Sequence, residues 1–222
     1  MSAETAHPAS GELDVRRFDS REVHVIDDDR DVRQSLHFLL QTFGIKAWPF
    51  ACAEDFFSNM SALKAAPILL DVRMAKMDGL QVLEQLRHEK ITWPVIMITA
   101  HGDIATAVRA VKLGAVEFLE KPFAVDLLEE ALTSAFDALD EADAITKHRQ
   151  IAGARLDSLS PRELQVLSVL IEGARNKVVA HRLGLSTRTV EMHRKNAMNK
   201  LGVRSIAEVI TLAATADRRI RN

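Results

Sequence analysis

Short apolar runs alternate with amphipathic stretches along the first part of the chain. The runs are mostly β-branched or aliphatic, and they occupy residues 23–26, 68–70, 95–98 and 115–119, with a weaker one at 45–50. Such runs are typical of strands buried on both faces of a parallel sheet. Apolar residues at helical spacing follow them, at residues 32–43, 56–63, 80–86, 107–113 and 127–136. These strand-then-helix units predict a doubly wound α/β fold, a five-stranded parallel sheet in the order 2-1-3-4-5.

The end of the chain shows helical patterns only. Ser160 to Glu163 combines an N-cap serine, a proline at the first helical position and a capping-box glutamate. A short helix is predicted over residues 176–183 and a longer one over 186–201, each followed by a glycine. Ser205 and Glu208 predict a second capping box before the last helix. The four helices predict a compact all-α domain.

The pattern divides the chain into four segments. Residues 1–21 are polar and show no apolar period, which predicts a disordered arm. The α/β domain is expected over residues 22–140 and the helical domain over 157–222. Residues 141–156 are charged and alanine-rich, and are expected to form a helical extension that runs into a linker.

Charge separates the two domains. Residues 1–156 carry 17 Lys and Arg against 25 Asp and Glu, whereas residues 157–222 carry 12 against 6. The basic domain is suited to nucleic acid, although charge by itself supports only non-specific binding.

Several classes of protein are disfavoured. No apolar run approaches the roughly 18–20 residues of a membrane span, and the polar start lacks the layout of a signal peptide, so a cytoplasmic protein is expected. Cys52 is the only cysteine, which excludes an internal disulfide and a cysteine-cluster zinc site. No phosphate-binding GxxxxGK[ST] loop is present, so an appended ATPase of the sigma-54-activator kind is not expected. The eight histidines lack metal-ligand spacing and are expected at the surface or at helix caps.

Polar residues stand at the ends of the predicted strands. Asp27 to Asp29 follow the first strand, Asp71 ends the third, Thr99 ends the fourth and Lys121 follows the fifth. The carboxyl ends of parallel strands meet at one edge, where such folds bind ligands. Crowded carboxylates favour a hard cation such as Mg²⁺, and a hydroxyl with an ammonium would suit a phosphoryl group. Taken singly, each residue could equally be a solvated turn residue.

These residues lie in four motifs: Val23 to Asp29, Leu70 to Met74 continuing through Met77-Asp78-Gly79, Ile98 to Asp103, and Glu120 to Phe123. In this order and spacing they resemble the signatures of a response-regulator receiver domain, particularly the FixJ branch. The resemblance spans about residues 22–140 and implies the flavodoxin-like version of the predicted sheet.

The receiver resemblance implies roles for the individual residues. Asp71 would accept a phosphoryl group from the phosphohistidine of a sensor histidine kinase. Mg²⁺ would be held by Asp28, Asp71 and the backbone carbonyl of Arg73, with Asp27 assisting through water. Thr99 and Lys121 would bind the phosphoryl oxygens, and the bond between Lys121 and Pro122 is expected to be cis. Such transfer needs positioning and charge neutralisation, so the domain would be a switch rather than a turnover enzyme, with at most self-dephosphorylation.

Two further positions follow from the receiver resemblance. Phe118 occupies the place of the switch aromatic, which would turn inward when Thr99 moves toward the phosphoryl group; a plain core aromatic is equally compatible with the sequence. The face around Ile104 to Leu119 would then form a two-fold dimer. Ala75 stands where relatives usually have proline, which leaves the rigidity of that loop and the phosphoryl lifetime open.

The basic domain contains a helix, a glycine turn and a second helix, the layout of a helix-turn-helix. A solvated basic face is the alternative interpretation. Residues from Leu159 to Leu212 nevertheless resemble the LuxR/FixJ-type DNA-binding domain over nearly their whole length, through Leu159 to Glu163, Asn176-Lys177, Ser186 to Arg194 and Lys200 to Ser205. The resemblance implies base contacts by Glu191, Met192 and Lys195, and phosphate contacts by Lys177, Arg188, Thr189 and Arg194.

The combined expectation is a two-component response regulator. Phosphorylation at Asp71 would promote dimerisation and binding to a near-palindromic promoter, and so regulate transcription together with RNA polymerase, with activation favoured. Two alternatives stay open: a phosphorylation-independent DNA-binding regulator with a vestigial receiver, and a signalling scaffold whose basic bundle binds protein.

Overall fold

The computed structural model describes residues 18–100, 104–218 and 220. The chain divides between Glu141 and Ala142 into two compact units. No helix in the described part of the chain has the length and apolar character needed to cross a membrane.

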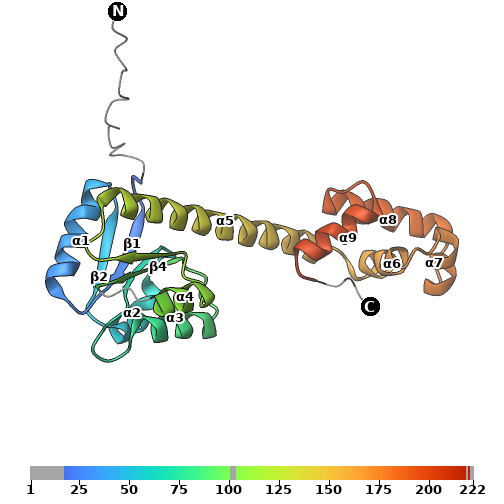
Figure 1. Ribbon diagram of the computed structural model, residues 1–222. Helices are drawn as coiled ribbons and strands as arrows, with labels where there is room; N and C mark the ends of the chain where they lie inside the picture. The colour runs from blue at the N-terminus through green and yellow to red at the C-terminus, as the bar shows by residue number, and fades with distance from the viewer. Residues whose placement is uncertain (1–17, 101–103, 219, 221–222) are drawn as a thin grey trace, which may run out of the picture. The chain divides into compact units, whose positions relative to one another are not determined.

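The first unit contains one parallel sheet (Figure 1). Its strands are β1 (Glu22–Ile26), β2 (Lys46–Phe50), β3 (Ile68–Asp71), β4 (Val95–Thr99) and β5 (Glu117–Glu120). All neighbouring strands pair in parallel, and their order is β2-β1-β3-β4-β5, which confirms the predicted topology. Every residue of β3 and β4 is buried, because helices cover both faces of these central strands.

Helices cover the sheet on both faces. They are α1 (Arg30–Thr42), α2 (Ala53–Asn59) with the short η1 (Met60–Ala62), α3 (Gly79–His88), α4 (Ile104–Lys112) and α5 (Val125–Asp157). Apolar residues of α1 and α5 pack into one core, and those of α2, α3 and α4 pack into the other. Residues 141–156, expected as a helical extension into a linker, are part of α5.

The N-terminal arm is shorter than the sequence indicated. Phe18 is buried and packs against the rings of Phe43 and Phe136, so residues 18–21 are not a disordered arm. Arg21 adds an ion pair with Asp140 at 2.6 Å and lies over the ring of Phe136. A single aromatic residue in a polar segment gives no periodic signal, which explains the error. Residues 1–17 of the arm lie outside the described residues.

His24 corrects a second expectation. This residue of β1 is fully buried, not at the surface or at a helix cap. Its ring stacks on Trp93 with centroids 5.2 Å apart, and its Nε2 lies 3.0 Å from the carbonyl oxygen of Lys64. Because β1 is covered on both faces, its side chains from Val23 to Ile26 are buried, whatever their polarity.

The second unit is all helical. After the end of α5 come α6 (Pro161–Ile171), α7 (Asn176–Leu183), α8 (Thr187–Leu201) and α9 (Ile206–Thr215). Their core is built from Val166, Leu167, Val179, Val190, Leu201 and Val209, with Ala152 and Leu156 from α5. These helices confirm the four-helix prediction.

The two predicted capping boxes differ in the structure. At Ser160 both hydrogen bonds with Glu163 are present, which confirms the first box. At Ser205 the side chain accepts from the backbone N–H of Glu208, but the Glu208 carboxylate accepts from the N–H of Arg204 rather than from that of Ser205. In the second box, the N–H that donates to the Glu208 carboxylate therefore belongs to Arg204, one residue before the N-cap Ser205.

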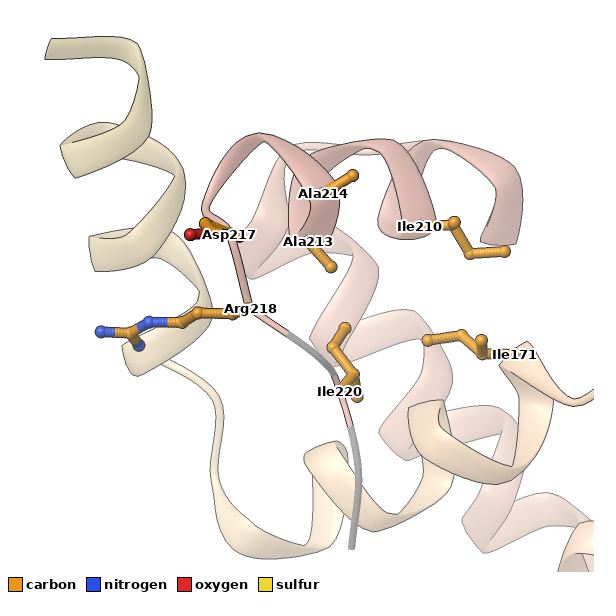
Figure 2. A pocket seen from close by; sticks show the side chains of 7 residues that line it. All are labelled: Ile171, Ile210, Ala213, Ala214, Asp217, Arg218 and Ile220. Atoms are coloured by element: carbon orange, nitrogen blue, oxygen red, sulfur yellow. The ribbon is translucent and has the colours of Figure 1, made fainter. Parts of the chain in front are cut away.

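An open cavity of about 550 Å³ lies in the second unit. Ile171 at the end of α6, residues of α9 and the segment after it line this cavity (Figure 2). Arg218, one of the lining residues, forms an ion pair with Asp157 at the end of α5.

Candidate functional site

Three polar residues meet at the carboxyl edge of the sheet. Asp27 directly follows β1, Asp71 ends β3 and Lys121 directly follows β5. The Lys121 ammonium donates to Asp27 Oδ2 at 2.8 Å and to Asp71 Oδ1 at 2.7 Å. Because the strands are parallel, residues far apart in sequence reach the same edge, and the lysine side chain bridges the distance across β4.

The charges at this edge are partly removed from water. Asp27 and Asp71 are buried, and Lys121 is half-buried. Burial raises the pKa of the Asp71 carboxyl, although its hydrogen bond and charge interaction with Lys121 oppose the shift. Burial acts to lower the pKa of Lys121, but the two carboxylates outweigh it and the pKa is raised. The ammonium therefore stays charged between two acidic groups.

Hydrogen bonds from the backbone fix both buried carboxylates. Asp71 Oδ2 accepts from the N–H of Arg73 at 2.7 Å, and Asp27 Oδ1 accepts from the N–H of Asp29 at 2.9 Å. Arg33 of α1 donates to the carbonyl oxygen of Asp27 at 2.6 Å, a contact that the sequence did not indicate. The side chains are thus held in place by the loops that follow β1 and β3.

Asp28 has a different environment. Its side chain is exposed, and its Oδ2 accepts from the backbone N–H of Ala75 in the loop after β3 at 3.0 Å. Within residues 18–100, 104–218 and 220, no group of three or more His, Cys, Asp or Glu side chains is close enough to hold a metal ion. Asp27 and Asp71 share the Lys121 ammonium, whereas the Asp28 carboxylate bonds to the loop after β3.

The donors at this edge fit Mg²⁺. The ion accepts one or two carboxylates and completes its shell with water and phosphate oxygens. Asp27 and Asp71 supply two carboxylates that already bind one cation, the Lys121 ammonium. Oxygen ligands without sulfur or imidazole favour a hard ion. The pair therefore has the chemistry that the ion needs.

Thr99 and Phe118 lie beside this site. Thr99 ends β4, is fully buried, and its carbonyl oxygen accepts from the N–H of Lys121 at 2.7 Å. Phe118 on β5 is half-buried and packs against the core beneath α4. Residues 101–103, which complete the Thr99 motif and include His101, lie outside the described residues. The peptide bond between Lys121 and Pro122 is cis.

Gly79 lies beside Asp71 in the structure. It belongs to one of the four receiver-like motifs, but the motif alone indicated no role for it. A Cβ at this position would lie 2.3 Å from the carbonyl oxygen of Asp71. The backbone N–H of Gly79 also donates to the carbonyl of Val72 at 2.8 Å. Glycine is required here because α3 begins against the backbone of the Asp71 segment. A glycine directly after the helix-capping Asp78 was the available signal.

The second unit presents a helix-turn-helix. Gly184 ends α7 in the left-handed conformation with φ 64°, and Ser186 caps α8 through the N–H of Thr189 at 3.0 Å. Val190, Ala197 and Leu201 turn the apolar side of α8 into the core. The opposite side of α8 faces outward.

That outward side carries most of the predicted DNA contacts. Arg188, Glu191, Met192 and Lys195 are exposed, and Thr189 and Arg194 are half-buried. Lys177 is exposed near the start of α7. An open groove of about 430 Å³ runs along this surface; its lining residues are Asn176, Glu191, Arg194, Lys195, Met198, Asn199, Val203 and Arg204. Asn176, Asn199 and Arg204 were not among the predicted contacts.

Comparison with known proteins identifies both units. Residues 23–133 match the family model described as the response regulator receiver domain, and residues 157–213 match the bacterial regulatory proteins of the luxR family. The transcriptional regulatory protein FixJ of Bradyrhizobium diazoefficiens is 40% identical over 194 residues, which cover 87% of this chain and 95% of that protein. The C4-dicarboxylate transport transcriptional regulatory protein DctR of Rhodobacter capsulatus is 39% identical over 189 residues, covering 84% and 96%.

A solved structure agrees with these matches. The response regulator StyR superposes with a TM-score of 0.76 at 38% identity, covering 87% of this chain and 98% of that one.

Proposed function

Since this chain belongs to the response regulators that join a receiver to a luxR-type DNA-binding domain, and is a two-component regulator of transcription, we propose that phosphorylation of Asp71 controls its binding to promoter DNA. Its two domains are those of a regulator rather than an enzyme. The phosphoryl donor is a sensor histidine kinase, and the protein acts in the cytoplasm, where its promoters are.

The contact of Lys121 with Asp71 carries this proposal. A carboxylate oxygen of Asp71 attacks the phosphorus of the phosphohistidine, the P–N bond breaks with its electron pair leaving on the imidazole, and an acyl phosphate forms. The Lys121 ammonium, 2.7 Å from Asp71 Oδ1, lies where negative charge increases during the transfer. Positioning and charge neutralisation of this kind are what phosphoryl transfer requires.

Mg²⁺ belongs to this proposal as the second source of positive charge. Asp27, Asp28, Asp71 and the carbonyl of Arg73 are the groups proposed to hold it. When bound, it neutralises charge on the phosphoryl oxygens and on the carboxylates. Thr99 is proposed to donate its hydroxyl to a phosphoryl oxygen, since it ends the strand between Asp71 and Lys121.

Phosphorylation is proposed to change the surface of α4 and β5. Movement of Thr99 leaves room for Phe118 to turn inward, so that the added charge biases a two-state element. Ile104, Val108 and Val111 expose apolar side chains on α4. We propose that this face forms a two-fold dimer, which places two helix-turn-helix units on the two halves of a promoter site.

The outward side of α8 is proposed to enter the major groove. Glu191, Met192 and Lys195 then reach base edges, and Lys177, Arg188, Thr189 and Arg194 contact phosphates. Binding near a promoter is proposed to activate transcription through RNA polymerase.

A phosphorylation assay tests the proposal. With acetyl phosphate and Mg²⁺, the wild-type chain is expected to gain one phosphoryl group by intact mass, and Asp71→Asn is expected to gain none. Asp137→Asn is the matched control, because Asp137 is exposed on α5 outside the site. Phosphorylation of Asp71→Asn to the level of the wild type would contradict the assignment.

DNA binding separates the remaining alternatives. Phosphorylation is expected to raise affinity for a selected promoter sequence in the wild type and not in Asp71→Asn. Equal binding by both would favour the phosphorylation-independent regulator. Binding of a protein to DNA phosphates weakens as the salt concentration rises. A scaffold whose basic bundle binds protein would not show such salt-dependent DNA binding.

A further inference from the structure

Glu191 is the only acidic residue of α8, the helix proposed to enter DNA. The helix otherwise carries Arg188, Arg194, Lys195 and Lys200. A carboxylate on a DNA-facing surface is repelled by the phosphates, so it weakens binding to DNA in general. Its place on this helix therefore calls for a contact in which negative charge is favourable.

Glu191 is also available for such a contact. It is exposed and lines the same groove as Lys195. A glutamate and a lysine four residues apart on a helix commonly pair. Within the described part of this domain, however, the ion pairs join Arg182 to Glu172, Lys200 to Glu163 and Arg218 to Asp157, and none involves Glu191 or Lys195.

The base edges of the major groove leave one good partner for a carboxylate. Guanine presents only acceptors there, and thymine presents an acceptor and a methyl group. Adenine presents an amino donor, but its N7 acceptor lies beside it and would repel a carboxylate oxygen. Cytosine presents its N4 amino group and has no acceptor of its own in the major groove, so it suits Glu191 best.

The neighbouring lysine fits the same assignment. Side chains four residues apart lie side by side on a helix, so Lys195 reaches a base close to the one that Glu191 contacts. Lysine donates to the O6 and N7 acceptors of guanine. A carboxylate and an ammonium side by side thus match the donor and acceptor edges of C·G base pairs.

We propose that Glu191 reads the N4 amino group of cytosine, so that each half of the DNA site carries a cytosine at the position facing this residue. This assignment rests on the proposed function, because it requires α8 to lie in the major groove. It names a base that the binding site must contain.

Selection from a randomised duplex pool tests the assignment. The full chain, phosphorylated with acetyl phosphate and Mg²⁺, is used to enrich a site, and each base pair of that site is then exchanged singly at fixed salt. The wild type is expected to lose about 10-fold in affinity when the cytosine facing Glu191 is replaced. Glu191→Gln is expected to prefer adenine at that same position, because an amide pairs with the N6 and N7 of adenine.

A matched control and a second readout accompany this experiment. Glu172→Gln makes the same change at an exposed residue that ends α6 and lies outside α8, and it is expected to keep the base preference of the wild type. On random DNA, Glu191→Gln is expected to bind several-fold more tightly than the wild type, because one repelling charge is gone.

The failures are distinguishable. An enriched site at which Glu191→Gln changes no base preference, or changes affinity equally for every base, would overturn the cytosine assignment and leave the proposed function in place. Failure of the wild type to enrich any sequence would overturn both the proposed function and this assignment.

Discussion

His24 links the stability of the receiver to pH. It is fully buried, and within the described residues its Nδ1 has no hydrogen-bond partner. Burial lowers the pKa of His24 below its ordinary value, although the hydrogen bond with Lys64 opposes the shift. The unfolded chain therefore binds a proton at this residue at a higher pH than the folded chain does. Stability is complete above the unfolded pKa of about 6.5 and falls as pH decreases toward the folded pKa.

We predict that replacing His24 removes this part of the pH dependence. The wild type is expected to lose up to about 1.4 kcal/mol of unfolding free energy per pH unit below pH 6.5 through His24. His24→Phe, which keeps a ring among aromatic neighbours, is expected to show a correspondingly flatter slope in urea unfolding between pH 7 and pH 5. The same change at the exposed His88 is the control, and equal slopes for His24→Phe and the wild type would refute the prediction.

Residue-level prediction from sequence was uneven for physical reasons. Asp27, Asp71 and Lys121 could be placed together because parallel strands bring their ends to one edge. The burial of His24 and Phe18 could not, since one polar residue in a strand and one aromatic residue in a polar segment follow no period. The roles of the site residues stay predictions until phosphorylation is measured.

At the scale of the elements, the loop between β3 and α3 holds Asp28 through a bond that depends on Ala75. The Ala75 N–H donates to Asp28 Oδ2 at 3.0 Å. Proline at this position would have no N–H to donate. The loop therefore holds one carboxylate oxygen of Asp28, which is one of the groups proposed to bind the ion.

We predict that Ala75→Pro raises the affinity for Mg²⁺. Without the competing hydrogen bond, Asp28 is free to turn toward the ion, and the dissociation constant is expected to fall about five-fold, the equivalent of about 1 kcal/mol. Isothermal titration calorimetry of the unphosphorylated protein measures this directly. Ala75→Gly retains the N–H and is expected to bind as the wild type does, whereas an unchanged constant for Ala75→Pro would show that the bond does not compete.

Most elements were predictable because their signals are local. Apolar runs and helical spacing indicated all five strands and the helices of both units, and the left-handed Gly184 and Gly202 mark the ends of α7 and α8 as expected. The capping at Ser205 differed because the geometry of the Glu208 side chain depends on the preceding turn. The hydrogen bond between Asp28 and Ala75 joins two loops, and sequence periodicity carries no information on such contacts.

At the scale of the whole molecule, the proposed function couples the acidic receiver to the basic helical domain through a dimer. The two cores of the receiver place α1 and α5 on one face of the sheet and α4 on the other. Val111 of α4 is 60% exposed and Phe38 of α1 is 59% exposed. These two residues offer equally apolar, equally exposed positions on opposite faces, which allows the proposed dimer face to be tested against a matched surface.

We predict that Val111→Arg blocks dimerisation while leaving phosphorylation intact. In a two-fold interface each copy contributes the same surface, so the substitution places two arginines in one apolar contact and removes their charges from water. Sedimentation velocity with acetyl phosphate and Mg²⁺ is expected to show a dimer for the wild type and for Phe38→Arg, and a monomer for Val111→Arg. Because a monomer engages only one half of a promoter site, its DNA affinity is expected to fall at least 10-fold. A phosphorylated Val111→Arg that sediments as a dimer would place the interface on another surface of the receiver.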